Sequence, residues 1–291
     1  MNISDRQKGI FLAFFGVLLI TPDSLIVRLV SLDTWNLLFY RSIVPGLFVL
    51  IGCAIVWRKD FFSILYKTGF PGILNSLFVF GGNIFFILSL QNTDVANTLV
   101  MVSLIPLIAA LISTIFLKES PYAITWLAMI LCLLMVFFIF FESFELGRFI
   151  GDFYGLLTAV FVASSLTVLR KYNHINLIPS YAMGKILTGL FASFFATSFV
   201  ILGYDIIYIL LMTITIGFSF VLITLAPRYI LSPEVGIFFL VETALGPLWV
   251  WLVINEVPTK NTLIGGIVIL LIIFIHSLFM IKIERKNYAN Q

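Results

Sequence analysis

The chain has 291 residues, of which 61% are hydrophobic and only 11% are charged, and its mean hydropathy is +1.14. A soluble domain needs many more polar residues to face water, so this composition excludes a water-soluble globular protein. The net charge of +3 is small, and no basic face interleaved with stacking aromatic residues is visible, so no nucleic-acid partner is expected.

Ten apolar stretches follow one another along the chain, and each approaches the roughly 20 residues that cross a bilayer as a helix. The predicted membrane helices cover residues 9–30, 34–57, 70–90, 95–117, 121–141, 151–170, 178–202, 206–226, 234–254 and 261–282. They leave almost nothing for a soluble domain, so we expect an all-α integral membrane protein. The first stretch lacks a small-x-small cleavage site, and we interpret it as a retained helix rather than a signal peptide.

The basic residues predict the orientation of these helices. With both termini in the cytoplasm, twelve of the 17 Lys and Arg residues fall in inner segments and three in outer segments, while Arg41 and Lys185 lie within spans. This distribution agrees with the positive-inside rule. We therefore expect a multi-pass protein of the inner (cytoplasmic) membrane with both ends inside and the lipid bilayer around it.

A repetition divides the ten helices into two sets of five. Glu119-Ser120-Pro121 recurs 137 residues later as Glu256-Val257-Pro258, and each tripeptide ends one apolar stretch and opens the next. Other pairs recur in the same order: Gly9 with Gly151, Arg28 with Arg170, Arg41 with Lys185, and Ala96 with Pro233. Because each set has an odd number of crossings, the second set enters the membrane upside down. The sequence thus predicts two inverted five-helix repeats, residues 1–142 and 143–291, with a site between them.

Here the sequence resembles the EamA-type members of the drug/metabolite transporter superfamily. The resemblance rests on Ser103–Pro106 followed by Glu119, thirteen residues after the proline, and on Glu242, fourteen residues before Glu256. The family usually has a proline directly after the glutamate that corresponds to Glu242, whereas here Thr243 follows it and the proline stands at Pro247. The resemblance covers essentially the whole chain. It implies ten spans in two repeats and a secondary transporter, with amino acids and related metabolites as the leading substrate class.

Four charged residues lie inside the predicted spans: Asp23, Arg41, Lys185 and Glu242. A charge near the bilayer centre costs at least about 2.5 kcal/mol, so each should face the protein interior, a partner or water. We expect an Asp23–Arg41 pair, and Lys185 and Glu242 are placed at comparable depths. Either these residues form ion pairs that fix helix packing, or they bind substrate or a coupling ion, and the two roles can coexist. Buried cations suit a carboxylate and a buried glutamate suits an ammonium group, so a zwitterion would satisfy both.

Further polar and kinked positions complete the candidate site. Prolines inside spans deprive the carbonyl four residues earlier of its helical donor, which makes either a hinge or a static kink. The hinge candidates are Pro22, Pro45, Pro106 and Pro247, and the additional candidates for substrate contact are Tyr40, Asn83 and Trp249, with Asn75 and Asn97 as further polar positions.

The favoured function is a secondary active transporter or exchanger that moves a small polar or amphipathic metabolite by alternating access. One alternative is a transporter of cationic, quaternary-amine or nucleoside-like metabolites, held by Glu242 and aromatic rings. A membrane enzyme is a third hypothesis, but the two His residues lie in different segments and no metal-like cluster accompanies them. No catalytic, metal, nucleotide or cofactor site is predicted, and the protein is expected to act as a monomer or homodimer on a small-molecule substrate.

Overall fold

The computed structural model describes residues 5–118, 123–201 and 203–289, and every regular element in these ranges is helical. The α-helices are α1 Asp5–Ile20, α2 Asp23–Leu29, α3 Thr34–Trp57, α4 Phe61–Lys67, α5 Gly69–Asn92, α6 Val95–Val102, α7 Ile105–Leu117, α8 Ala123–Glu145, α9 Phe149–Lys171, α10 Ile178–Ser193, α11 Asp205–Leu225, α12 Ser232–Ile254 and α13 Lys260–Ala289. Two short 3-10 turns, η1 Arg58–Asp60 and η2 Ala226–Arg228, extend α3 and α11. The predicted all-α membrane fold is confirmed.

Seven segments within the described residues are long and apolar enough to cross a membrane: α1 with α2, α3 with α4, α5, α6 with α7, α9, α11 and α12. The helices α8 and α13 contain the shorter apolar stretches Trp126–Ile139 and Lys260–His276, and α10 has 16 residues. These ten segments follow the predicted spans in order, while the count of ten crossings itself stays a prediction. Large apolar side chains such as Phe137 and Leu252 lie exposed on the outside, where hydrocarbon accepts them without the penalty of water.

Two predicted spans are broken helices. The first divides into α1 and α2 at Thr21-Pro22, and the fourth divides into α6 and α7 at Ser103-Leu104. Pro22 directly precedes α2 and Pro106 lies in the first turn of α7, where a missing N–H is tolerated because the first turn has no intrahelical acceptor. Pro45 and Pro247 instead lie inside the continuous helices α3 and α12.

The predicted span 178–202 extends beyond the C-terminal end of the helix that the structure contains. Helix α10 stops at Ser193, and the chain then runs in non-helical backbone towards α11. This segment is fastened to the start of α3: the Tyr40 hydroxyl donates to the carbonyl of Phe199 over 2.6 Å, and Thr197 donates to Asp33 over 3.2 Å. Side-chain partners from α3 and its N-cap thus replace helical hydrogen bonds here.

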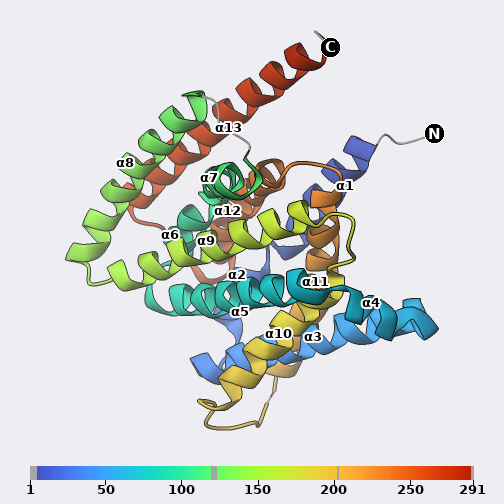
Figure 1. The fold of residues 1–291 in the computed structure, drawn as a ribbon. Coiled ribbons are helices and arrows are strands. Elements are labelled where there is room, and N and C mark those ends of the chain that lie inside the picture. Colours follow the sequence, from blue (N-terminus) through green and yellow to red (C-terminus); the bar gives the residue numbers. More distant parts are fainter. Residues whose placement is uncertain (1–4, 119–122, 202, 290–291) are drawn as a thin grey trace.

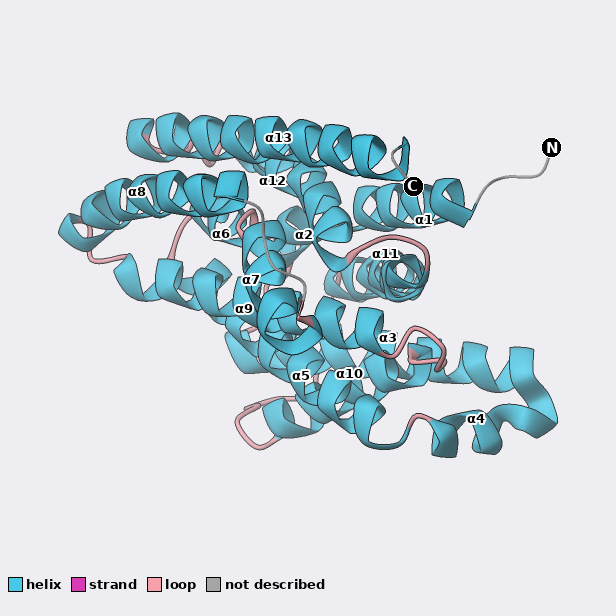
Figure 2. Ribbon diagram, turned by 45° about the horizontal axis from the view of Figure 1, so that its top comes forward, coloured by secondary structure: helices cyan, strands magenta, loops and turns pink. Residues whose placement is uncertain are grey.

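The helices of the two predicted halves interleave (Figure 1). Helix α3 packs along α10, α5 along α9, α1 along α11, and α12 against α6 and α7. The helices α8 and α13 pack on each other at one side of the bundle, as Figure 2 also shows. If the halves are matched in order, with α1 corresponding to α9 and α5 to α11, then the α5–α9 contact is the counterpart of the α11–α1 contact. These two contacts are therefore equivalent under the predicted repeat.

The approach of α12 to α7 depends on a glycine. A Cβ atom added to Gly236 would lie 2.8 Å from Cα and 2.9 Å from N of Pro106, closer than real Cβ contacts. Because backbone atoms cannot move aside as a side chain can, only glycine fits at this crossing. The contact joins the two predicted halves beside the break between α6 and α7.

Candidate functional site

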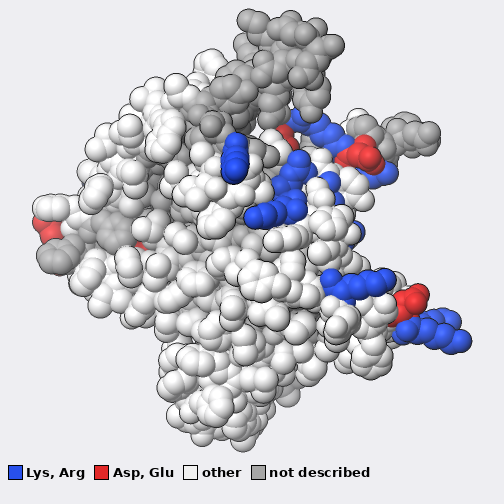
Figure 3. Space-filling model, in the orientation of Figure 1, with Lys and Arg blue, Asp and Glu red and all other residues white. Residues whose placement is uncertain are grey.

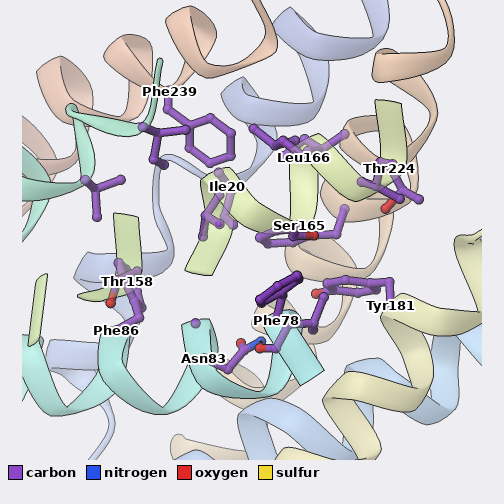
Figure 4. A pocket seen from close by; sticks show the side chains of 18 of the residues that line it. Ile20, Phe78, Asn83, Phe86, Thr158, Ser165, Leu166, Tyr181, Thr224 and Phe239 are labelled. Carbon is purple, nitrogen blue, oxygen red and sulfur yellow. Dashed lines mark hydrogen bonds between the residues drawn. The ribbon is translucent and has the colours of Figure 1, made fainter. Parts of the chain in front are cut away.

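A central cavity lies between the two predicted halves. Its walls come from α1, α3, α5, α6 and α7 on one side of the sequence repeat and from α9, α10, α11 and α12 on the other. Figure 4 shows Phe78, Ser165 and Tyr181 approaching one another from α5, α9 and α10. Most of the lining is apolar, and the polar lining residues are Arg41, Asn75, Asn83, Thr158, Ser165, Tyr181, Thr224 and Glu242.

Arg41 is the cation that lines this cavity. Its side chain is 3% exposed, and it pairs with Asp23, whose side chain is fully buried. The Nε group donates to Asp23 Oδ1 over 3.3 Å, Nη2 donates to Asp23 Oδ2, and Nη1 donates to Asn83 Oδ1 over 3.2 Å. A guanidinium has five N–H donors, so two remain without a partner among the described residues. The Phe86 ring lies on the guanidinium, with its centroid 5.1 Å from Cζ.

The helix break places Asp23 for this pairing. Asp23 is the first residue of α2, and a carboxylate is favoured there because the N–H groups of a first turn point towards it. The expected Asp23–Arg41 pair is thus formed across α2 and α3.

Lys185 lies behind the cavity wall rather than in it. Its side chain is fully buried on α10, and its ammonium group donates to Asn83 Oδ1, the same oxygen that Arg41 uses. The Asn83 amide nitrogen donates to the carbonyl of Val79 over 2.7 Å, which orients the amide oxygen towards the two cations. No carboxylate of the described residues forms an ion pair with Lys185, so a Lys185–Glu242 pair is not formed.

Glu242 is the carboxylate that lines the cavity. It lies on α12, its side chain is 3% exposed, and it accepts no hydrogen bond from the described part of the chain. The neighbouring Thr243 hydroxyl donates to the carbonyl of Leu99 over 3.0 Å and so ties α12 to α6. Glu242 is therefore held on a fixed helix with its carboxylate available to a ligand.

Among the other polar lining residues that the structure describes, Ser165 and Asn75 have hydrogen-bond partners and the Tyr181 hydroxyl does not. Ser165 donates to Asn75 over 2.7 Å, and Asn75 donates to Ser180 over 2.8 Å, which joins α9, α5 and α10. The Tyr181 hydroxyl has no hydrogen-bond partner among the described residues, although its ring stacks on Phe220 at a centroid distance of 4.7 Å. Tyr181 can thus donate to or accept from a molecule in the cavity.

Three polar positions singled out in the sequence lie elsewhere. Tyr40 holds the segment after α10, as described above. The Trp249 indole donates to Thr21 over 3.3 Å at the break between α1 and α2, and Asn97 donates to Asp152 over 3.1 Å. The structure therefore brings Arg41, Asn83 and Glu242 to the cavity, places Asp23 and Lys185 behind them, and leaves Tyr40, Trp249 and Asn97 outside it.

Ion pairs join the two halves at the ends of the bundle. Arg28 Nε lies 3.1 Å from Glu256 Oε2, and Glu256 Oε1 accepts the backbone N–H of Val95 over 2.7 Å. Next to them Arg148 pairs with Asp94. Burial raises the pKa of the Asp94 carboxyl above its ordinary value of 3.8, and the neighbouring Arg148 offsets only part of this rise.

Arg6 also pairs across the predicted halves, with Glu234 over 2.6 Å. It lies 142 residues before Arg148, the spacing of the predicted repeat. The first copy of the repeated motif, Glu119-Ser120-Pro121, lies outside the described residues, so only the Glu256 copy can be placed.

Comparison with known proteins agrees with the sequence resemblance. Residues 7–141 match the model of the EamA-like transporter family. Seventeen chains of known structure match the fold. One of them, titled "Crystal structure of protein", has a TM-score of 0.72 and 16% identity, with 94% of this chain and 98% of that chain covered. No curated protein matches the chain. The resemblance to EamA-type transporters is confirmed over residues 7–141, and it agrees with the multi-pass membrane fold.

Proposed function

From the EamA-like character of residues 7–141, we propose that the chain is a secondary active transporter or exchanger of an amino acid or related compound. The observation that carries this proposal is the cavity between the halves. It is lined by Arg41 and Glu242, and two N–H donors of Arg41 and the carboxylate of Glu242 have no partner among the described residues. A secondary transporter needs such a site near the middle of its repeats.

The chemistry of the lining favours a small zwitterion. A guanidinium edge binds a carboxylate through charge-assisted hydrogen bonds, and a buried carboxylate binds an ammonium group. Aromatic lining residues, among them Phe78, Phe220 and Phe239, surround these groups with apolar surface for a side chain. An amino acid carries all three features on one small molecule.

Alternating access would use the inverted repeats 1–142 and 143–291 as the moving units. The matched packing of α5 on α9 and of α11 on α1 supports this division. The pairs Arg28–Glu256 and Arg148–Asp94 at one end, and Arg6–Glu234 at the other, each join the two halves, so opening either end requires its ion pairs to separate.

The orientation in the cytoplasmic membrane rests on the basic residues. Figure 3 shows Lys and Arg side chains gathered on the edge of the visible face that carries the start of α1 and the helix α4. This edge is the one that the positive-inside rule assigns to the cytoplasm.

The test is uptake into proteoliposomes of labelled L-leucine, L-threonine, L-glutamate, uridine and choline. We expect saturable uptake of at least one amino acid, and a loss of at least about tenfold in Arg41→Gln, because each tenfold corresponds to only about 1.4 kcal/mol. Lys171→Gln is the matched control, since Lys171 is exposed at the end of α9. Flux that stays at the level of empty liposomes for all five compounds would contradict the proposal.

The unpartnered Glu242 favours one second candidate, a transporter of cationic amines. Saturable uptake of choline without uptake of any amino acid, abolished in Glu242→Gln and retained in Arg41→Gln, would support this candidate over the first.

A further inference from the structure

The charges around the cavity are unevenly matched. Asp23 and Arg41 neutralise each other through an ion pair in which both side chains are buried. Lys185 is equally buried, yet within the described part of the chain its amine donates only to the neutral Asn83. An ammonium ion taken out of water without a counter-ion is strongly disfavoured.

The carboxylate that acts on Lys185 is Asp23 of α2, and it is already paired with Arg41. Among the described residues, the helices that pack against α10 add no further carboxylate in the middle of the span. Helix α3 contributes the cation Arg41, and α5 has no ionisable residue. Helix α11 has Asp205 and Tyr208, but both lie in its first turn and not in the middle of the helix. On α10 itself the only other ionisable side chain is Tyr181, whose ring centroid lies 6.0 Å from the Lys185 nitrogen.

A neutral amine resolves this imbalance while the cavity is empty, because an amine still donates a hydrogen bond to Asn83. A carboxylate bound to the free N–H donors of Arg41 would reverse the situation. This carboxylate would add a negative charge next to Asn83, whose Oδ1 already accepts a hydrogen bond from the Lys185 amine. The ammonium form of Lys185 would then have its counter-ion.

We infer that Lys185 takes up one proton when the carboxylate of a substrate binds at Arg41, and that this proton crosses the membrane with the substrate. This inference rests on the proposed function and names the coupling of the same site. The proton comes from water on the side to which the cavity opens and converts the amine to an ammonium ion. When the carboxylate leaves on the other side, the proton returns to water there.

Lys185 is a positioning residue in this scheme, because it acts through Asn83 and does not itself line the cavity. Tyr181, one helical turn earlier, lines the cavity, and its hydroxyl has no hydrogen-bond partner among the described residues. Glu242 lines the cavity and can exchange a proton when an ammonium group binds, so the experiment has to separate its contribution from that of Lys185.

The experiment is isothermal titration of L-leucine, L-threonine and L-glutamate into the purified protein, in phosphate and in Tris at one pH. The difference in heat between the two buffers gives the protons taken up per bound amino acid. We expect Lys185→Gln to take up one proton fewer than the wild type, whatever Glu242 contributes. Lys171→Gln, at an exposed position, must give the wild-type number.

Two further variants keep the test decisive. Lys185→Arg has a permanently charged group and should also take up one proton fewer if Lys185→Gln does not bind. Glu242→Gln leaves Lys185 as the responding group, so binding to it should consume one proton. Equal proton numbers in the wild type and the Lys185 variants, or none consumed by Glu242→Gln, would overturn the inference. If none of the three amino acids binds the wild type, the proposed function fails and the inference fails with it.

Discussion

Removing both partners of the Asp23–Arg41 pair should cost less free energy of unfolding than the two single removals added together. Asp23 is fully buried and Arg41 is 3% exposed, so Arg41→Gln leaves a carboxylate in the protein interior without its cation. Breaking a buried ion pair in this way costs about 3–5 kcal/mol. In the double variant Asp23→Asn with Arg41→Gln, two amides face each other and can share a hydrogen bond, so the coupling between the substitutions should recover about 2–3 kcal/mol.

The assay is unfolding by SDS in mixed micelles, followed by the fluorescence of the five Trp residues. The four proteins of the cycle are compared at the same detergent ratio. Uptake is measured in parallel, because Arg41 should be needed for binding even where the double variant restores the fold. The reasoning is refuted if the double variant loses as much free energy of unfolding as the two single variants together.

Three further predictions concern other parts of the chain. Burial raises the pKa of Asp94, so stability from this site is present below its ordinary value of 3.8 and is lost as the pH rises through the raised value. Thermal unfolding should therefore favour Asp94→Asn over the wild type increasingly as the pH rises above 3.8, and a difference that stays constant with pH would contradict this. Gly236→Leu should cost at least about 1–3 kcal/mol in the SDS assay, whereas Gly52→Leu, with open space around its Cβ, should not. Single cysteines at Asn2 and Ser143, in a protein without other cysteines, should react from the inside and the outside respectively, and the reverse pattern would reject the orientation.

The helical fold could be predicted because lipid imposes it: only helices satisfy their backbone in a membrane without closing a barrel, and apolar length marks each one. The breaks were harder to locate. Four prolines inside spans look alike in the sequence, but Pro22 and Pro106 lie at new helix starts while Pro45 and Pro247 do not interrupt their helices. Whether a proline ends a helix depends on how the neighbouring helices pack around it, and packing cannot be read from the position of the proline in the sequence.

The charged part of the site could be predicted for a related reason. A buried charge is expensive enough to stand out, so Arg41, Lys185 and Glu242 were visible in the sequence. The apolar and hydroxyl lining was not, because the chain has 31 Phe residues and most of them serve packing or lipid equally well. One signal was available: Asn75 and Asn83 on α5 define a helical stripe that also contains Phe78, Phe86 and their neighbours in the lining. Extending each polar position along its helix would have found them.

The arrangement around Arg41 explains why a costly buried pair can serve a transporter. Asp23 fixes one edge of the guanidinium and Asn83 a further donor, so the remaining N–H groups are oriented before any substrate arrives. Binding then requires little reordering of a long side chain, which would otherwise weaken affinity. The ion pair with Asp23 also neutralises the buried charge of Arg41. Among the described residues, Lys185 and Glu242 form no ion pair of this kind, and the inferred proton uptake at Lys185 rests on that difference.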